Sequence, residues 1–245
     1  MKNNKLLLLV KGDLYRLNKY NVFFMSLLIA LAWGLILYFV NAEVFNALLP
    51  FIILTDATLM SIFYIGSVMF FEKKESTLST ILVTPVSNQE IILSKVLSNT
   101  LHNLFSTALI IIAFVFIKDT EINYLLMLLA IIVVTAVFTS WGLLISYFQK
   151  DFTTMLTNIM ALMFVFLLPT ALYSFGVFKS DIWEYVLLIN PIQAAQEVIM
   201  GGFRGFTLDW QYYFSLGYLL IGGFLSYKFL IVPYFNKYAA SISGV

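Results

Sequence analysis

Long apolar stretches alternate with short polar ones along almost the whole chain. Each apolar stretch has about 20 residues or more, the length that an α-helix needs to cross a hydrocarbon layer about 30 Å thick. Because unpaired backbone groups are costly in hydrocarbon, such stretches form helices that satisfy their own hydrogen bonds. The pattern therefore predicts an all-α polytopic membrane protein with six transmembrane helices. They cover residues 22–40, 48–71, 99–117, 122–148, 154–175 and 212–234.

The N-terminal segment 1–20 differs from the spans because it is short and charged. Apolar Leu7, Val10, Leu14 and Leu17 recur at helical spacing, and basic residues lie between them. This pattern is typical of a helix that lies in the interface of an anionic membrane surface. A solvated N-terminal tail is the alternative.

Residues 179–209 interrupt the pattern before the last span. Asn190-Pro191 breaks an apolar run, and polar side chains then recur too often for a span. The segment predicts one or two short helices at the outer surface, or dipping partway into the membrane in the manner of a re-entrant segment. Pro191 suits the start of such a helix and Gly201-Gly202 its end.

The composition limits what the chain can be. Of its 245 residues, 61% are hydrophobic and only 11% are charged, against about 25% charged in soluble proteins. Residues 1–245 are therefore interpreted as a single membrane domain without room for a sizeable soluble one. The net charge of +1 gives no reason to expect a nucleic-acid partner. The absence of cysteine and the single histidine argue against a metal site.

The basic residues predict the orientation in the membrane. Loops on the cytoplasmic side carry an excess of lysine and arginine. With the N-terminus inside, three basic residues fall outside: Lys118, Lys179 and Arg204. Eleven fall on or near the cytoplasmic side: Lys2, Lys5, Lys11, Arg16, Lys19, Lys73, Lys74, Lys95, Lys150, Lys228 and Lys237. We therefore expect a multi-pass protein of the cell membrane with both termini in the cytoplasm.

The polar segment 72–95 between the second and third spans carries a short amphipathic motif. Leu78, Ile81 and Leu82 share one face of a helix that Pro85 ends. The sequence 87–90 then has the S-x-x-E form of a capping box, which starts the next helix. The segment predicts a helix parallel to the membrane, followed by a second helix that leads into the third span.

These features resemble the ABC-2 type transporter permeases over nearly the whole chain. That family combines six spans, a membrane-parallel coupling helix between the second and third, and a polar outer segment before the sixth. Asn190-Pro191 is similar to the outer Asn-Pro turn of the family, and Ser76 stands where many relatives carry glycine. The matching residues of the coupling region are Glu72, Glu75, Thr77, Leu78, Leu82, Thr84, Pro85 and Lys95.

The resemblance implies partners. A homodimer, or a dimer with a similar permease, would dock its coupling helices in clefts on two cytoplasmic ABC ATPases. The chain has no G-x-x-x-x-G-K-[ST] phosphate loop, so ATP and Mg are expected in the ATPase and no cofactor in this chain. The expected ATPase-coupling residues are Glu72, Lys73, Lys74, Glu75, Thr77, Leu78, Ile81, Leu82, Thr84 and Pro85.

The resemblance also implies a function. We expect an exporter permease that moves an amphipathic or hydrophobic compound outward, such as a drug, an antimicrobial peptide or a peptide toxin. The compact chain resembles the phenol-soluble modulin exporters in this respect. A permease for a polysaccharide or a lipid-linked cargo is an alternative within the same fold. A non-transporting membrane sensor and an intramembrane enzyme are alternatives from other classes.

Four ionisable groups are candidates for the pathway or its gates: Asp56, His102, Glu197 and Arg204. Charged groups within a membrane are costly and face protein or water. Asp56 is either a pathway or dimer-interface group, or a carboxyl that only packs helices. His102 lines a vestibule or lies at the interface, on a face shared with Asn99. Glu197 and Arg204, seven residues apart, form an outer gate or a solvated pair.

Overall fold

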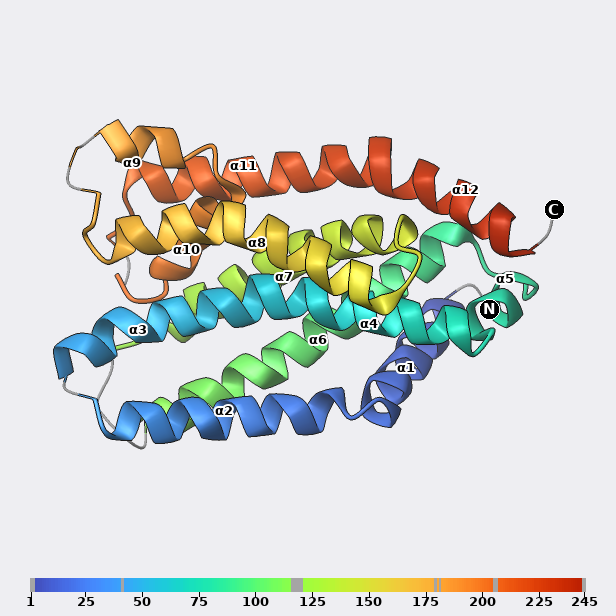
Figure 1. The fold of residues 1–245 in the computed structure, drawn as a ribbon, viewed down its shortest axis with the longest axis horizontal. Helices are drawn as coiled ribbons and strands as arrows, with labels where there is room; N and C mark the ends of the chain where they lie inside the picture. The colour runs from blue at the N-terminus through green and yellow to red at the C-terminus, as the bar shows by residue number, and fades with distance from the viewer. Residues whose placement is uncertain are drawn as a thin grey trace.

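The computed structural model describes residues 3–40, 42–115, 121–178, 180, 182–204 and 207–243. Within these ranges every regular element is a helix, and the long helices run roughly along one axis (Figure 1). The fold is therefore all-α, as predicted. The helices are α1 (Asn3–Lys19), α2 (Val22–Tyr38), α3 (Ala42–Thr55), α4 (Ser61–Lys74), α5 (Thr77–Leu82), α6 (Asn88–Val115), α7 (Tyr124–Tyr147), α8 (Phe152–Ser174), α9 (Ile182–Leu187), α10 (Pro191–Met200), α11 (Trp210–Ser226) and α12 (Val232–Ser243), with π-helical turns η1 (Asp56–Met60) and η2 (Tyr227–Ile231).

Some predictions fall partly on residues outside the described ranges. These are residues 1–2 of the N-terminal segment, 116–117 of the third predicted span, and 179, 181, 205 and 206 of the outer segment. Of the basic residues used for the orientation, Lys2, Lys118 and Lys179 lie outside the described ranges too.

Several helices have the length and apolar character of membrane spans. In the described residues there are five: Leu48–Lys74, Asn88–Val115, Tyr124–Tyr147, Phe152–Ser174 and Trp210–Ser241. The helices α1 and α2 form a pair bent by 59°, and the number rises to six if this pair counts as one span. The chain is thus a multi-pass membrane protein.

The helix of the third span, α6, begins well before residue 99. It starts at the capping box, where the Ser87 amide donates to Glu90 Oε2 at 2.7 Å and the Glu90 amide donates to Ser87 Oγ at 3.2 Å. This confirms the predicted box. Because nothing interrupts the helix afterwards, α6 carries its polar first turns and its apolar span as one rigid rod.

The second span contains a π-helical turn that the sequence pattern does not reveal. The turn η1 joins α3 to α4 without a break and places Asp56 at its first position. Such turns widen a helix locally and are frequent at functional sites. A second one, η2, joins α11 to α12 in the same way.

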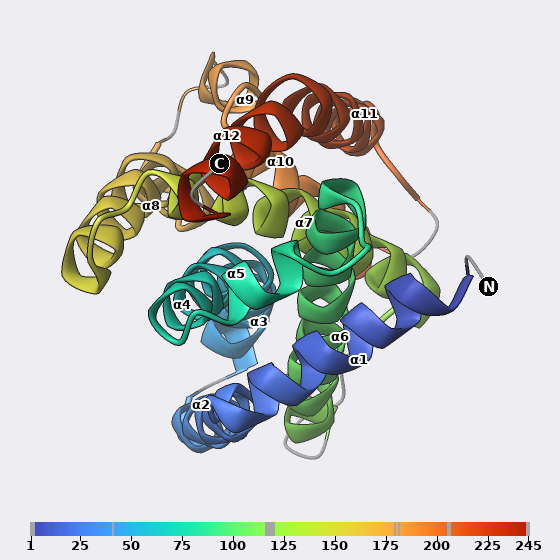
Figure 2. The ribbon, with the colours of Figure 1, turned by 90° about the vertical axis from the view of Figure 1, so that its right-hand side faces the viewer.

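The helix α7 lies in the middle of the bundle and organises the main core (Figure 2). It packs against α4, α6, α10 and α11. Gly142 permits the close crossing with α4, because a Cβ there would lie 2.6 Å from Ile65 Cγ2 and 2.9 Å from Ile62 Cα. Small residues at such crossings let helix backbones approach in a membrane, where no hydrophobic effect drives the helices together.

The outer segment forms two short helices with different surroundings. Asn190 caps α10 through its side chain, which accepts from the Ile192 amide at 2.9 Å, and Pro191 occupies the first helical turn. Ala194 and Ile199 of α10 are fully buried, and α10 packs on α3, α7, α8 and α11. In contrast, α9 exposes most of its side chains. The helix α10 is therefore packed into the bundle, and α9 lies on the surface of the bundle.

The bundle has two distinct ends. One carries α1, α5 and the C-terminal part of α12, together with both chain ends, and the opposite one carries α9 and the loop into α3 (Figure 1). We name them the α5 end and the α9 end.

Candidate functional site

The candidate coupling helix α5 is a separate short helix between α4 and α6 at the α5 end (Figure 1). The chain leaves α4 through Ser76, whose backbone adopts a left-handed conformation with φ of 57°. Only glycine adopts this conformation without strain. The need for this turn explains why a glycine would suit position 76.

The apolar edge of α5 faces its own bundle. Leu78 is 0% exposed and packs in a cluster with Ile92 of α6 and Phe235 of α12, while Ile81 and Leu82 are partly buried against the same cluster. This edge therefore seats α5 on the protein itself. Because Leu78 is not at the surface, a partner cannot contact it. Leu78 is therefore removed from the set of coupling residues expected from the sequence.

Most of the remaining candidates flank α5, at the end of α4 and just after α5. Thr77 is partly buried. Val83, which sequence reasoning did not select, is 80% exposed. The sequence signal for Val83 was its position between the amphipathic motif, which ends at Leu82, and Pro85. The exposed members of the predicted set are Lys73, Lys74, Glu75, Thr84 and Pro85.

Glu72 is also turned inward, into a buried ionic cluster. Its carboxylate pairs with Arg16 Nε at 2.8 Å and with Lys95 Nζ at 2.5 Å. Asp13 completes the cluster, at 2.5 Å from Arg16 Nη2 and 3.4 Å from Lys95 Nζ, and accepts a hydrogen bond from Ser94 Oγ at 2.6 Å. The two acids balance the two bases. Glu72 therefore holds the end of α4 to α1 and α6 instead of facing a partner.

This cluster adds bonds between α1 and the bundle that the prediction for α1 did not include. The Arg16 side chain faces the protein and Leu17 packs against Tyr64 and Val68, whereas Leu7 is exposed. The helix is thus bonded to the bundle by its charges as well as by its apolar residues. The sequence prediction did not include Asp13. It is the only acidic residue in positions 1–20, and it lies three residues before Arg16.

The same helix holds both ends of the α5 segment. At the start, Lys19 Nζ and the Tyr20 hydroxyl donate to Glu75 Oε2 at 2.8 and 3.0 Å. At the end, Lys5 Nζ donates to the Pro85 carbonyl oxygen at 2.6 Å. The pKa of the Glu75 carboxyl lies below its usual value because Lys19 and Tyr20 bond to it. Consequently α1, α5 and the adjoining ends of α4 and α6 are linked into one unit.

Asp56 faces the neighbouring helix α6. Its carboxyl accepts from Ser106 Oγ at 3.0 Å and from Thr107 Oγ1 at 3.3 Å, and its side chain is buried. Hydroxyl bonds of this kind join helices across a membrane core. In this chain the carboxyl is therefore an internally bonded group between two helices.

His102 is buried, so the prediction of an interfacial position is wrong. Its Nε2 lies 2.9 Å from Ser26 Oγ of α2, and its ring meets those of Phe23 and Tyr64 edge-on. These two rings, on α2 and α4, keep it from the surface. Asn99, on the predicted shared face, donates to Thr139 Oγ1 at 2.7 Å. This face thus bonds α6 to its neighbours.

Glu197 and Arg204 meet at the α9 end as their spacing predicts. Arg204 Nη1 lies 3.4 Å from Glu197 Oε2 and 3.1 Å from Asp209 Oδ2. Gln193 Nε2 donates to the other Glu197 oxygen at 3.1 Å. Burial raises the pKa of Glu197, and the charge of Arg204 offsets only part of this effect. The pair ties the end of α10 to the loop that leads into α11.

Comparison with known proteins identifies the family. The family described as ABC-2 type transporter matches residues 6–203, which include the spans through α8, the α5 region and α10. No curated protein matches the chain. Members of this family are the transmembrane subunits of ABC transporters and not their ATPases. The chain therefore belongs to the ABC-2 type transporter family and is a permease subunit of an ABC transporter.

Proposed function

We propose that this permease works in an ATP-driven exporter and that α5 is the helix through which the ATPase drives it. The observation that carries the proposal is the attachment of α5. Thr80 of α5 and the next residues, Val83 and Thr84, are exposed and accessible to a partner, and Leu78 fixes the inner edge of α5. A force that a partner applies to these exposed residues would therefore be transmitted to the bundle through Leu78.

The buried ionic cluster would transmit such a force from the α5 region to neighbouring helices. Glu72 at the end of α4 and Lys95 in α6 are held together with α1. A displacement of α5 would thus shift α4, α6 and α1 together, since breaking the buried ion pairs is costly. Because α4 and α6 continue into spans, such a shift would alter the packing within the membrane.

The remaining parts of the proposal follow from the family and the charges. Two cytoplasmic ATPases would bind ATP and Mg and act on two permeases, identical or similar. The α5 end, which carries both termini, would lie in the cytoplasm of a cell-membrane protein. An amphipathic or hydrophobic compound, such as a peptide or a drug, is the proposed cargo, because the candidate spans carry few charged residues.

Purification of the tagged full-length chain from its native membranes tests the proposal. Thr80→Glu/Val83→Glu adds two charges to exposed positions of the α5 region. Val177→Glu/Thr207→Glu makes the same two changes at exposed positions of the α9 end and serves as the matched control. Mass spectrometry should find a protein with an ABC phosphate loop with the wild type and the control, and lose it with the α5 variant. Equal capture by all three chains would contradict the proposal for α5, and no ATPase with any of them would contradict the whole proposal.

A further inference from the structure

The helix α8 is attached to the bundle at both of its ends. At the start, the Phe152 ring lies 5.4 Å from that of Phe70 and 6.1 Å from that of Phe71. At the far end, Asn190 Nδ2 donates to Thr170 Oγ1 at 3.1 Å, and Gln196 Nε2 donates to Ser174 Oγ at 2.7 Å. Between the ends, Ile159 and Met163 of α8 are buried, but α8 as a whole makes few close backbone contacts with α7.

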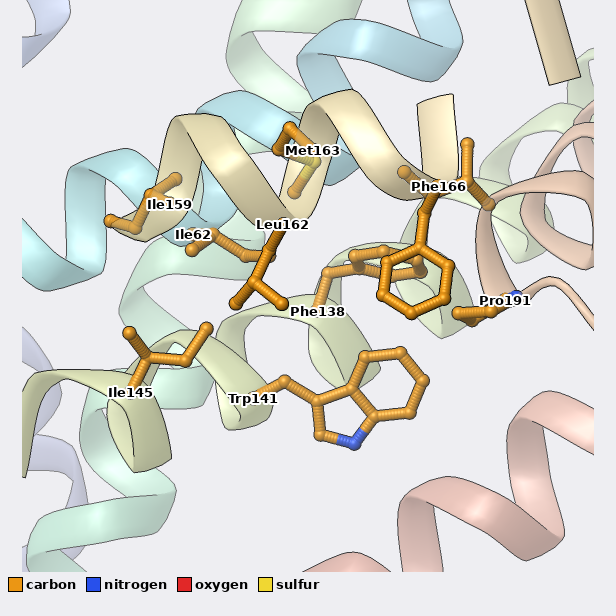
Figure 3. Close-up of a pocket in the computed structure, with 10 residues that line it drawn as sticks. Ile62, Phe138, Trp141, Ile145, Ile159, Leu162, Met163, Phe166 and Pro191 are labelled. Carbon is orange, nitrogen blue, oxygen red and sulfur yellow. The ribbon is translucent and has the colours of Figure 1, made fainter. Parts of the chain in front are cut away.

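An apolar pit occupies the space between the middle of α8 and α7 (Figure 3). Its empty volume of about 420 Å³ includes the space at its open side. Its rim includes Leu162 and Phe166 of α8, which are 41% and 37% exposed. Its floor is buried and consists of Ile62, Phe138, Ile159, Met163 and Ile192.

No polar side-chain group faces the pit. Its one candidate, the indole nitrogen of Trp141, instead donates to Ser226 Oγ of α11 at 2.9 Å, which fixes the ring as a carbon wall. Apolar cavities of this kind stay dry and bind apolar molecules. The expected occupant is therefore a hydrocarbon group without polar atoms.

The position of the pit selects among hydrocarbon occupants. Leu162 and Phe166 lie within α8, and Trp141 lies within α7, and both helices have the length and composition of membrane spans. The partly exposed rim thus opens sideways at the level of the bilayer. Lipid hydrocarbon surrounds the bundle at that level and reaches the rim without crossing a polar layer.

We propose that the pit holds one acyl chain of a membrane lipid, inserted between α7 and α8. The headgroup stays outside, since the pit offers it no polar partner. The acyl chain fills the space between α7 and the partly exposed Leu162 and Phe166 of α8, so that the packing of this helix depends on lipid. This site is independent of the ATPase contact proposed for α5.

A brominated lipid tests the proposal through Trp141. Phenylalanine replaces the other tryptophans, Trp33, Trp183 and Trp210, in the full-length chain. The protein is reconstituted in phosphatidylcholine vesicles with or without bromine on the acyl chains, because bromine quenches indole fluorescence on contact. Leu162→Phe fills the pit, and Leu162→Ala widens it. Val165→Phe adds a ring on the exposed side of α8 and is the matched control.

The single-tryptophan chain and Val165→Phe should be quenched strongly and equally. Leu162→Phe should lose about half of the quenching or more, and Leu162→Ala should keep it or increase it. Equal quenching of Leu162→Phe and Val165→Phe would overturn the proposal, as would weak quenching of all variants, which would leave the pit to cargo or to a second copy of the chain. If Leu162→Phe fails to fold, Ile145→Phe fills the same pit from α7.

Discussion

The buried ionic cluster allows a quantitative test of how the coupling region is held. Glu72→Gln removes one of the two negative charges at constant shape, and Arg16 and Lys95 are then left with Asp13 alone. The Lys95 side chain is 2% exposed, so water cannot replace the lost partner. Removing one member of a buried ion pair costs about 3–5 kcal/mol. We expect a loss of this size in the free energy of unfolding.

A double-mutant cycle with Lys95→Met separates the effect of unbalanced charge from a general loss of stability. Lys95→Met alone leaves Glu72 and Asp13 with a single base and should cost about as much as Glu72→Gln. The double variant keeps the Asp13–Arg16 pair at 2.5 Å and is neutral again. Its loss should fall below the sum of the single losses by roughly 0.5–3 kcal/mol, the range for residues in contact.

The assay is unfolding of the purified chain in mixed micelles by increasing sodium dodecyl sulfate, followed by circular dichroism. Glu75→Gln is the control, because its partner Lys19 is half exposed and the pair should contribute little. The reasoning would be refuted if Glu72→Gln destabilised no more than Glu75→Gln. It would also be refuted if the losses at positions 72 and 95 simply added.

Three further predictions concern single positions. Ser76→Gly should raise the free energy of unfolding by about 1 kcal/mol because it relieves a left-handed backbone, whereas Ser76→Ala should not; an equal effect of the two would contradict this. Gly142→Ala should cost about 1–3 kcal/mol through its clash with Ile62, whereas Gly217→Ala, where nothing lies near, should be neutral or stabilising; a harmless Gly142→Ala would refute the close crossing. Because the pKa of Glu197 is raised in the folded chain, its carboxyl keeps a proton at pH values where the unfolded chain has already lost it. The free energy of unfolding should therefore fall as the pH rises from the usual pKa of 4.5 to the raised pKa, and it should fall less in Glu197→Gln. Identical pH profiles of the two chains would contradict the assignment.

Most of the helices could be predicted from the sequence because local signals mark them. Apolar length gives the spans, the box at Ser87 and Glu90 starts α6, and Asn190-Pro191 starts α10. Each of these signals depends only on residues that are near in the sequence. The existence of a short helix after residue 76 follows from the same kind of pattern.

Which side of each helix faces the protein could not be predicted in this way. In a soluble protein, polar residues mark the outer face, but in a membrane both faces are apolar. On α7, Phe138 is buried while Ile132 is exposed, and no local pattern separates the two. The burial of Glu72 and His102 depends on partners far away in the sequence, Arg16 and Ser26. The π-helical turn at Asp56 likewise has no sequence signal that we could use.

Cross-linking from α5 tests the central claim most directly. The chain has no cysteine, so Val83→Cys introduces a single thiol at a position that is 80% exposed, and Val177→Cys supplies an exposed control at the α9 end. In native membranes treated with a short thiol-to-amine cross-linker, the account predicts a product between position 83 and a protein with an ABC phosphate loop, and none from position 177. A product with that protein from position 177, or from neither position while the two proteins still purify together, would contradict the account.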